Sequence, residues 1–267
     1  MKIAVVTTFN NRLYKEYAHK FIQTYFDHWP WDLHIYSEDQ IHYNSIFTRT
    51  KERLFEYNTF KEIPDCESFV ERNKDKPHVP PKQFEKMWRQ VKGFRHDGVR
   101  FCYKVYAYTD FILNKSENYD AVICIDADSW FFKKIGSEFI KEHISKPGCM
   151  MSYLGRGSTY HSEAGFLFFD LNHSHTKNYA DQMKKMYDED SIYKIPEQHD
   201  SYVWDYVREK FESKGVLTND IGDGRTGHVQ ARSVLGKVYD HVKGRKPKKK
   251  GFSIENRKAV NELNKDK

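Results

Sequence analysis

The feature that most constrains the fold of this 267-residue chain is an apolar run that ends in two acids. Residues 121–125 read Ala-Val-Ile-Cys-Ile, and Asp126 and Asp128 follow with one alanine between them. Such a run is typical of a strand buried on both faces of a sheet. Two carboxylates at its end repel each other and lose solvation unless a cation lies between them. Because ligands bind at the carboxyl ends of strands in open α/β sheets, the pattern predicts a divalent metal site there.

The rest of the chain alternates between strand-like and helix-like segments. Residues 3–8 are predicted to form a buried strand, residues 12–27 carry apolar side chains at helical spacing, and residues 33–37 follow as a short strand. Together they make a βαβ unit. Further strands are predicted at 149–154 and 165–171, and further helices at 100–114, 174–188 and 199–213. The sequence therefore predicts a single α/β domain with a mostly parallel, partly mixed central sheet flanked by helices.

Two regions fall outside this alternation. Residues 40–98 are rich in charged and aromatic side chains and are interrupted by prolines, which predicts an irregular insertion with a short helix near 82–92. Residues 243–250 hold six basic side chains and no acid, and the whole chain has a net charge of +6. Because the rest is neutral overall, nucleic-acid binding by the body is not expected. We divide the chain into a main domain, 1–242, and a basic segment, 243–267, that closes over the site and ends in a tail.

The cysteine pattern and the hydropathy indicate the class of protein. None of the four cysteines, Cys66, Cys102, Cys124 and Cys149, forms a CxxC pair, so we expect buried free thiols. No stretch approaches the roughly 18 apolar residues of a membrane span. The first residues run directly into a predicted strand, without the pattern of a signal peptide. We expect a soluble, cytoplasmic protein without a transmembrane segment.

Two motifs resemble those of a known enzyme family. The apolar strand, the Asp-Ala-Asp and the aromatic residues 130–132 resemble the DxD motif of GT-A-fold glycosyltransferases, in which the two acids bind a metal that holds the diphosphate of a nucleotide-sugar. His241-Val-Lys-Gly-Arg-Lys-Pro247 is similar to the C-terminal HxxGxxKP motif of retaining family 8 glycosyltransferases. The resemblance implies a GT-A fold, Mn²⁺ (or Mg²⁺) and a UDP-sugar donor. It also implies transfer, with retention, to a saccharide or another hydroxyl acceptor.

The resemblance assigns metal ligands. It implies that Asp126, Asp128 and His241 bind the ion, with the backbone of Ala127 beside the donor. An imidazole is a suitable additional ligand for Mn²⁺. His228, in a glycine-rich stretch, is the competing candidate for the third ligand.

The same resemblance places the basic segment on the diphosphate. It implies contacts from Gly244 and Lys246. One residue fewer separates the glycine from Lys-Pro here than in the family, so Lys243 and Lys248 are alternatives to Lys246. A basic segment of this kind can close over phosphates once the donor is bound.

Other positions are implied to contact the nucleotide. Arg100 and Lys104 are four residues apart, so they share a helix face. In the family, basic residues on the helix before the DxD strand reach the diphosphate or the sugar. Thr7 and Thr8 at the end of the first strand, and Asp39 after the second, are implied contacts to base and ribose. No glycine-rich dinucleotide or P-loop fingerprint is present, which argues against NAD(P) and Walker-type ATPases.

Two acids are candidates for contact with the reacting sugar. Glu163, in His161-Ser-Glu-Ala-Gly165, stands where family 8 members carry an asparagine. Asp200, in Glu197-Gln-His-Asp200, aligns with the last acid of the family's Asp-Gln-Asp region. Either acid could orient sugar hydroxyls, stabilise an oxocarbenium-like transition state or serve as an inverting base. Retention of configuration is therefore implied by the resemblance alone.

Two alternatives come from other classes of protein. A phosphatase of the haloacid dehalogenase type also uses Asp-x-Asp, but it requires threonine or valine where Trp130 stands. A non-catalytic protein could use the basic segment to bind polyanions, and the neutral body argues against this reading.

Overall fold

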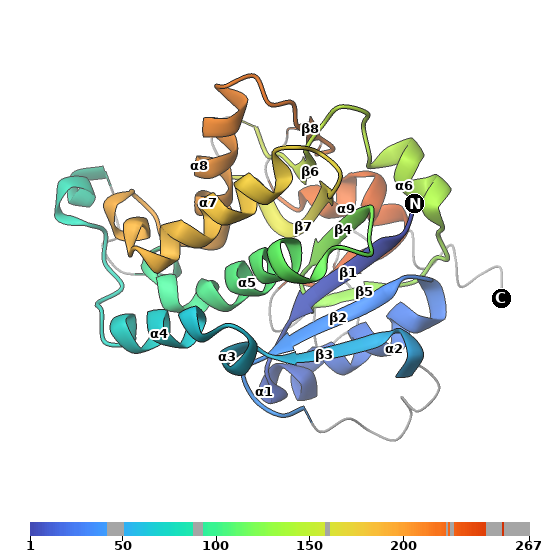
Figure 1. Cartoon of the computed structure of the whole chain (residues 1–267), viewed down its shortest axis with the longest axis horizontal. Coiled ribbons are helices and arrows are strands. Elements are labelled where there is room, and N and C mark those ends of the chain that lie inside the picture. The colour runs from blue at the N-terminus through green and yellow to red at the C-terminus, as the bar shows by residue number, and fades with distance from the viewer. Residues whose placement is uncertain are drawn as a thin grey trace.

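A computed structural model of the protein describes residues 1–41, 51–87, 93–157, 161–222, 224, 227–243 and 253. A seven-stranded sheet in the order β3-β2-β1-β4-β7-β6-β8 lies between helices (Figure 1). Its strands are β1 (Ile3–Thr8), β2 (Asp32–Ser37), β3 (Leu54–Asn58), β4 (Ala121–Ile125), β6 (Met151–Leu154), β7 (Glu163–Asp170) and β8 (Asn219–Asp220). A separate two-stranded sheet pairs β5 (Ser129–Phe131) with β9 (Tyr239–His241).

The strand directions place several chain ends at one edge of the large sheet. β3, β2, β1 and β4 are parallel to one another, β7 runs antiparallel to both β4 and β6, and β8 is parallel to β6. This confirms the predicted mostly parallel sheet with a mixed portion. Val6 lies opposite Cys124, and Ile125 lies opposite Phe166. The carboxyl ends of β1 and β4 and the beginning of β7 therefore meet at the same edge.

Helices cover both faces of the sheet. They are α1 (Asn11–Leu13), α2 (His19–His28), α3 (Thr59–Glu62), α4 (Pro64–Asn73), α5 (Gly98–Asp110), α6 (Ser137–His143), α7 (Thr176–Asp188), α8 (Asp200–Glu212) and α9 (Val229–Arg232). A π-helical turn, Tyr14–Ala18, joins α1 to α2, and another, Phe111–Lys115, continues α5. The predicted helices at 12–27, 100–114, 174–188 and 199–213 are confirmed.

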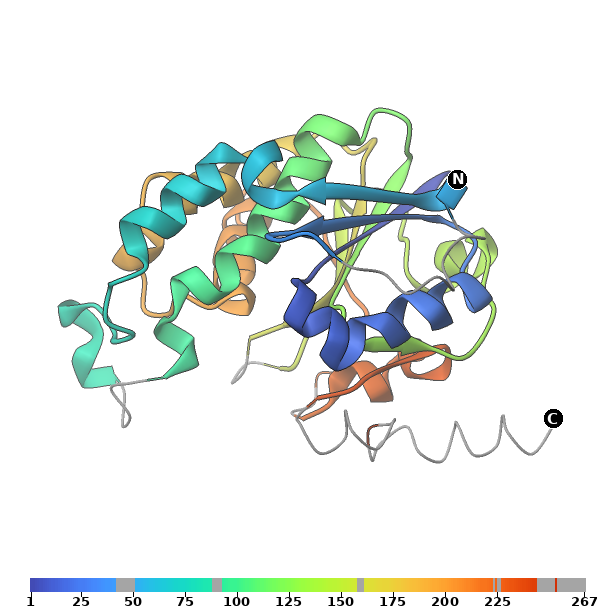
Figure 2. The same ribbon diagram turned by 90° about the horizontal axis from the view of Figure 1, so that it is seen from below.

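The alternation of side chains along the strands explains the apolar runs. Ala4 and Val6 pack in a cluster with residues of α4, α5, α7 and α8, whereas Ile3 and Val5 pack with residues of α2, α6 and α9. Figure 2 shows these two layers on either side of the sheet. Because successive side chains point to opposite faces, a central strand covered on both sides must be apolar at every position.

Three predictions need correction or completion. The segment 40–98 is not merely irregular, because it contributes strand β3 at the sheet edge and helices α3 and α4. Of the helix predicted at 82–92, the structure describes a 3₁₀ turn over Lys82–Met87. Beyond residue 215, where no strand or helix was predicted, the chain forms β8, α9 and β9.

The cysteine prediction is confirmed, since all four cysteines are buried and free. Among the described residues, no helix has both the length and the apolar character needed to cross a membrane.

Candidate metal centre

The two acids of the Asp-Ala-Asp motif converge because strand β4 ends before them. The strand stops at Ile125, a turn carries Asp126 and Asp128, and β5 begins at Ser129. The amide of Asp126 still donates to the carbonyl oxygen of Gly165 in β7 at 3.1 Å. On a continuing strand the two side chains would point to opposite faces, so the turn is what brings both carboxylates to the same side.

The small β5–β9 sheet brings a histidine against these acids. His241 lies opposite Ser129, and the amide of Val242 donates to the carbonyl oxygen of Asp128 at 2.9 Å. The Nε2 atom of His241 lies 3.0 Å from Asp128 Oδ1 and 3.6 Å from Asp126 Oδ2. The structure thus brings together the three residues that the sequence motifs singled out.

The three residues fit a hard divalent cation. One ligand atom from each of Asp126, Asp128 and His241 lies within 4.8 Å of the others. An octahedral ion with bonds of 2.0–2.1 Å places adjacent ligands about 2.9 Å apart, close to the 3.0 Å between His241 Nε2 and Asp128 Oδ1. Two carboxylates and one imidazole suit Mn²⁺ or Mg²⁺, with positions left for phosphate oxygens and water.

His228, the competing candidate, is used differently. Its Nε2 lies 2.7 Å from the carbonyl oxygen of His241, and its Nδ1 accepts from the amide of Ala231 at the start of α9. Both ring nitrogens therefore contact backbone. His228 supports the strand that carries His241, and His241 is the histidine that faces the acids.

Lys104 connects the acid pair to α8. Its Nζ lies 2.6 Å from Asp126 Oδ1 and 2.7 Å from Asp200 Oδ2, and its side chain is only 12% exposed. Burial alone would lower the pKa of Lys104, but the two carboxylates raise it well above its usual value. Burial alone would raise the pKa of Asp200, but the neighbouring Lys104 lowers it below its usual value. Arg100 lies exposed one turn earlier on α5, with its guanidinium 5.6 Å from the ring of Phe101.

Glu163, at the start of β7, is buried between two cations. Its Oε2 contacts Arg156 Nη2 and Lys243 Nζ, and its Oε1 accepts from the amide of Gly165. Partial burial and the neighbouring Arg156 lower the pKa of Lys243 to about 8. Sequence reasoning missed Arg156, although its place between Gly155 and Gly157, directly after a predicted strand, is a usable signal.

The remaining candidates lie at the same edge or outside the described residues. The buried hydroxyl oxygens of Thr7 and Thr8 have no hydrogen-bond partner within the described part of the chain. Asp39 Oδ1 accepts from the amide of Asn11 at the start of α1, which occupies one of its oxygens. Ala127 is buried between the two acids. Gly244, Lys246 and Lys248 lie outside the residues that the structure describes.

Gly165 leaves the space that His241 fills. A Cβ at this position would lie 2.5 Å from Cε1 and 2.7 Å from Nδ1 of His241, so the ring would have to move. We expect Gly165→Ala to weaken Mn²⁺ binding about tenfold and to destabilise the fold by about 1–3 kcal/mol through overpacking. Mn²⁺ titration followed by electron paramagnetic resonance measures the affinity. Gly93→Ala is the matched control, because nothing lies within 4 Å of its added Cβ. Equal Mn²⁺ affinities for the two variants would contradict the expectation.

Comparisons with known proteins give a likeness at the level of shape. No protein-family model matches the sequence, and no curated protein matches it. Among solved structures, the crystal structure of mouse xyloside xylosyltransferase 1 in its apo form is similar over 83% of this chain and 86% of that chain. The TM-score is 0.49 and the sequence identity is 8%.

Proposed function

We propose that this chain is a metal-dependent glycosyltransferase that moves a sugar from a nucleotide-sugar, with UDP as the nucleotide, to a hydroxyl acceptor. The observation that carries the proposal is the convergence of Asp126, Asp128 and His241 at the carboxyl edge of a mostly parallel sheet. The resemblance of the Asp-Ala-Asp strand to the DxD motif of GT-A-fold enzymes gives this convergence its interpretation. On the same resemblance, we propose that the fold is of the GT-A type.

The donor would bind across this edge. Asp126, Asp128 and His241 would hold Mn²⁺ or Mg²⁺, which, when bound, neutralises charge on the departing diphosphate. Thr7 and Thr8 end the neighbouring strand β1, where their unsatisfied hydroxyl groups could hydrogen-bond the nucleoside. Asp39, which follows β2 and accepts the amide of Asn11 with one oxygen, would contact the base and the ribose.

Positive charge around the diphosphate would come from two places, the basic segment 243–267 and helix α5. Lys243 already lies against Glu163 beside the acid pair, and it begins the basic segment 243–267. We propose that this segment, with Gly244 and Lys246, covers the bound diphosphate. Arg100 would approach from the exposed end of α5.

Two buried carboxylates would face the sugar. Lys104 lowers the pKa of Asp200, and Glu163 lies against Arg156 and Lys243. Each can therefore stabilise positive charge that develops at the anomeric carbon. We propose retention of configuration on the family 8 resemblance. If Asp200 or Glu163 instead acts as a base toward the acceptor, the product is inverted, and nuclear magnetic resonance of the product anomer distinguishes the two.

The proposal is tested by release of UDP from a panel of UDP-sugars. The full chain is expected to release UDP and free or transferred sugar with Mn²⁺ and to be inactive with EDTA. Release of inorganic phosphate from phosphomonoesters, without cleavage of any UDP-sugar, would instead indicate a phosphatase. Binding of polyanions that is lost on removing residues 243–267, in a chain that binds no nucleotide, would indicate a non-catalytic protein.

Two histidine variants separate the ligand from its support. We expect His241→Ala to weaken Mn²⁺ binding by at least about 100-fold, because it removes a nitrogen that faces both acids. His228→Ala removes only the hydrogen bond to the His241 carbonyl oxygen, so we expect a loss of about tenfold or less. Mn²⁺ affinities of both variants, measured side by side, check the order. A larger loss in His228→Ala would contradict the assignment of His241.

A further inference from the structure

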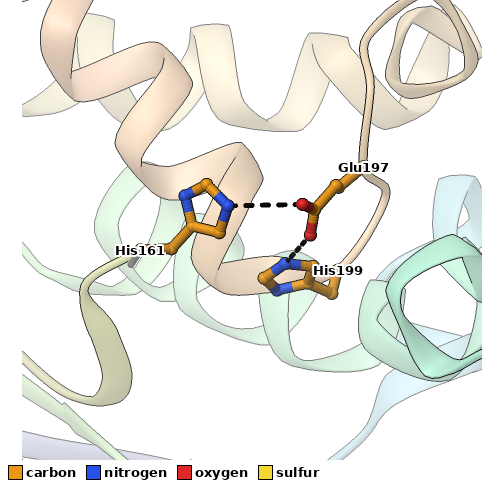
Figure 3. A group of neighbouring side chains, drawn as sticks. All are labelled: His161, Glu197 and His199. Atoms are coloured by element: carbon orange, nitrogen blue, oxygen red, sulfur yellow. Dashed lines mark hydrogen bonds and ion pairs between the residues drawn. The ribbon is translucent and has the colours of Figure 1, made fainter. Parts of the chain in front are cut away.

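A second group of metal-ligating side chains lies beside the first site. It consists of His161, just before β7, and Glu197 and His199, just before α8 (Figure 3). His161 Nε2 lies 3.5 Å from Glu197 Oε1, and His199 Nε2 lies 2.6 Å from Glu197 Oε2. One ligand atom from each residue falls within 4.8 Å of the others. His161 thus lies close to Glu197 and His199, although it precedes Glu197 by 36 residues in the sequence.

The segment that carries two of these side chains is firmly fixed. The amides of Gln198 and His199 both donate to the carbonyl oxygen of Arg95, at 2.8 and 3.2 Å. The fully buried side chain of Gln198 donates to the carbonyl oxygen of Ile195 at 2.8 Å. Glu197 and His199 therefore project from a backbone that is held on both sides of Gln198. Ligands held in advance in this way lose little entropy when an ion binds.

Aromatic contacts also fix the two imidazole rings. The ring centroid of His161 lies 4.7 Å from that of Tyr202 in an edge-to-face arrangement, and that of His199 lies 6.2 Å from that of Phe101. The two imidazole centroids are 5.4 Å apart. The rings therefore flank the Glu197 carboxylate and do not stack on each other, which leaves its lone pairs accessible from two sides.

The contacts of Glu197 suit a cation. Its carboxylate is in contact with His161, His199 and Arg95. An ionised carboxylate is only an acceptor, so His199 donates its Nε2–H to it. Arg95 Nη1 lies 3.2 Å from Oε1 and orients the carboxylate from outside, as partners of metal-bound carboxylates commonly do. A carboxylate has about four lone-pair positions, enough for Arg95 and an ion together.

We propose that His161, Glu197 and His199 form a second metal site, selective for Zn²⁺ and similar borderline transition metals. Two imidazoles and one carboxylate are a three-ligand set that zinc uses when it keeps a fourth position open. A tetrahedral ion with bonds of about 2.0–2.1 Å places its ligands about 3.3 Å apart, close to the 3.5 Å between His161 Nε2 and Glu197 Oε1. His199 Nε2 lies 2.6 Å from Glu197 Oε2, a hydrogen bond that the ion would replace. On binding, the ion replaces the Nε2 proton of His199, which passes to solvent or to Nδ1.

The two sites differ in the hardness of their ligands. The Asp126, Asp128 and His241 site offers two carboxylates and one imidazole, whereas the second site offers the reverse proportion. Carboxylate-rich sets favour Mg²⁺ and Mn²⁺, and imidazole-rich sets favour Zn²⁺ and Co²⁺. The choice of ion can therefore separate the sites in one protein.

The second site joins two segments that also carry the buried acids Glu163 and Asp200. Asp200 follows His199 directly, and Glu163 lies two residues after His161. An ion on the second site would therefore tie together the backbone that carries these two buried acids. His161 also lines a pocket of about 320 Å³ together with Arg156 and Asp205, so the open position of the ion would lie beside that pocket.

The test is made in full-length protein with the first site disabled. Asp126→Asn and Asp128→Asn together remove its carboxylates, and Zn²⁺ affinity is measured by competition with a chromophoric chelator. We expect this protein to bind one Zn²⁺, and to give the intense visible bands of four-coordinate Co²⁺. Adding His161→Phe keeps a ring against Tyr202 but removes the ligand, and should weaken Zn²⁺ binding by about 100-fold. Glu197→Gln, the second variant, should cause a comparable loss.

His143→Phe, in the same background, is the matched control. His143 has a similar side-chain exposure to His161, 38% against 35%, and it also lies near a single glutamate. It should leave Zn²⁺ affinity unchanged, and circular dichroism confirms that each variant is folded. The proposal is overturned if the protein without Asp126 and Asp128 carboxylates binds no Zn²⁺. It is equally overturned if His161→Phe and Glu197→Gln both bind Zn²⁺ as tightly as His143→Phe does.

Discussion

Asp128→Asn is expected to lower the Mn²⁺-dependent affinity for UDP by at least about 100-fold. The substitution keeps the shape of the side chain but removes the charge that would face the cation, 3.0 Å from His241 Nε2. The fold should survive, because the carbonyl oxygen of residue 128 still accepts from the amide of Val242. A change in metal binding without a change in fold is what separates a ligand from a structural acid.

Calorimetric titration with UDP at saturating Mn²⁺ measures this effect. Asp181→Asn is the matched control, since it removes a carboxylate on α7 that forms an exposed i,i+4 pair with Lys185. It should leave the affinity unchanged. If Asp128→Asn binds UDP in Mn²⁺ as tightly as Asp181→Asn, the metal does not bridge the protein and the diphosphate.

Lys104→Met is expected to lower the free energy of unfolding by about 3–5 kcal/mol. Methionine fills similar space but leaves the buried carboxylate of Asp200 and the half-buried carboxylate of Asp126 without the ammonium that lies 2.6–2.7 Å from both. Removing one partner of a buried charge cluster costs far more than losing a surface ion pair, because an uncompensated charge stays in a medium of low polarity. Urea unfolding followed by circular dichroism measures the change.

A lysine with a more exposed partner and a second substitution serve as controls for this prediction. Lys184 also contacts two acids, Asp65 and Asp188, but one of them is 61% exposed, so Lys184→Met should cost about 1 kcal/mol or less. Adding Asp200→Asn to Lys104→Met should restore part of the lost stability, because it removes one of the stranded charges. The explanation is wrong if Lys104→Met costs no more than Lys184→Met, or if Asp200→Asn destabilises the Lys104→Met protein further.

The central part of the fold could be predicted because its buried strands are short continuous runs of apolar residues. Residues 121–125 and 3–6 are apolar at every position, since helices cover both of their faces. Strand β3 was missed because it lies at the sheet edge, where Leu54-Phe-Glu-Tyr-Asn58 mixes polar and apolar side chains without a period. The three-residue strands β5 and β9 are too short to produce a pattern.

The candidate site was predictable to the extent that one motif or one helix contained it. The spacing of Arg100 and Lys104 predicted a shared face, but only the packing of α5 against α8 shows that Lys104 is buried and Arg100 exposed. The approach of Arg156 to Glu163 depends on how a loop folds back on β7. The approach of His161 to Glu197 depends on the juxtaposition of two distant segments. Apart from the two glycines that flank Arg156, neither approach leaves a local signal in the sequence.

The central claim, that the chain binds a nucleoside diphosphate through a metal, is tested most directly on the wild-type protein. UDP is titrated calorimetrically into the chain with Mn²⁺ present, and again after the protein is made metal-free with EDTA. We predict binding with Mn²⁺ and none with EDTA. Equal UDP affinity under the two conditions, or no binding under either, would contradict the claim.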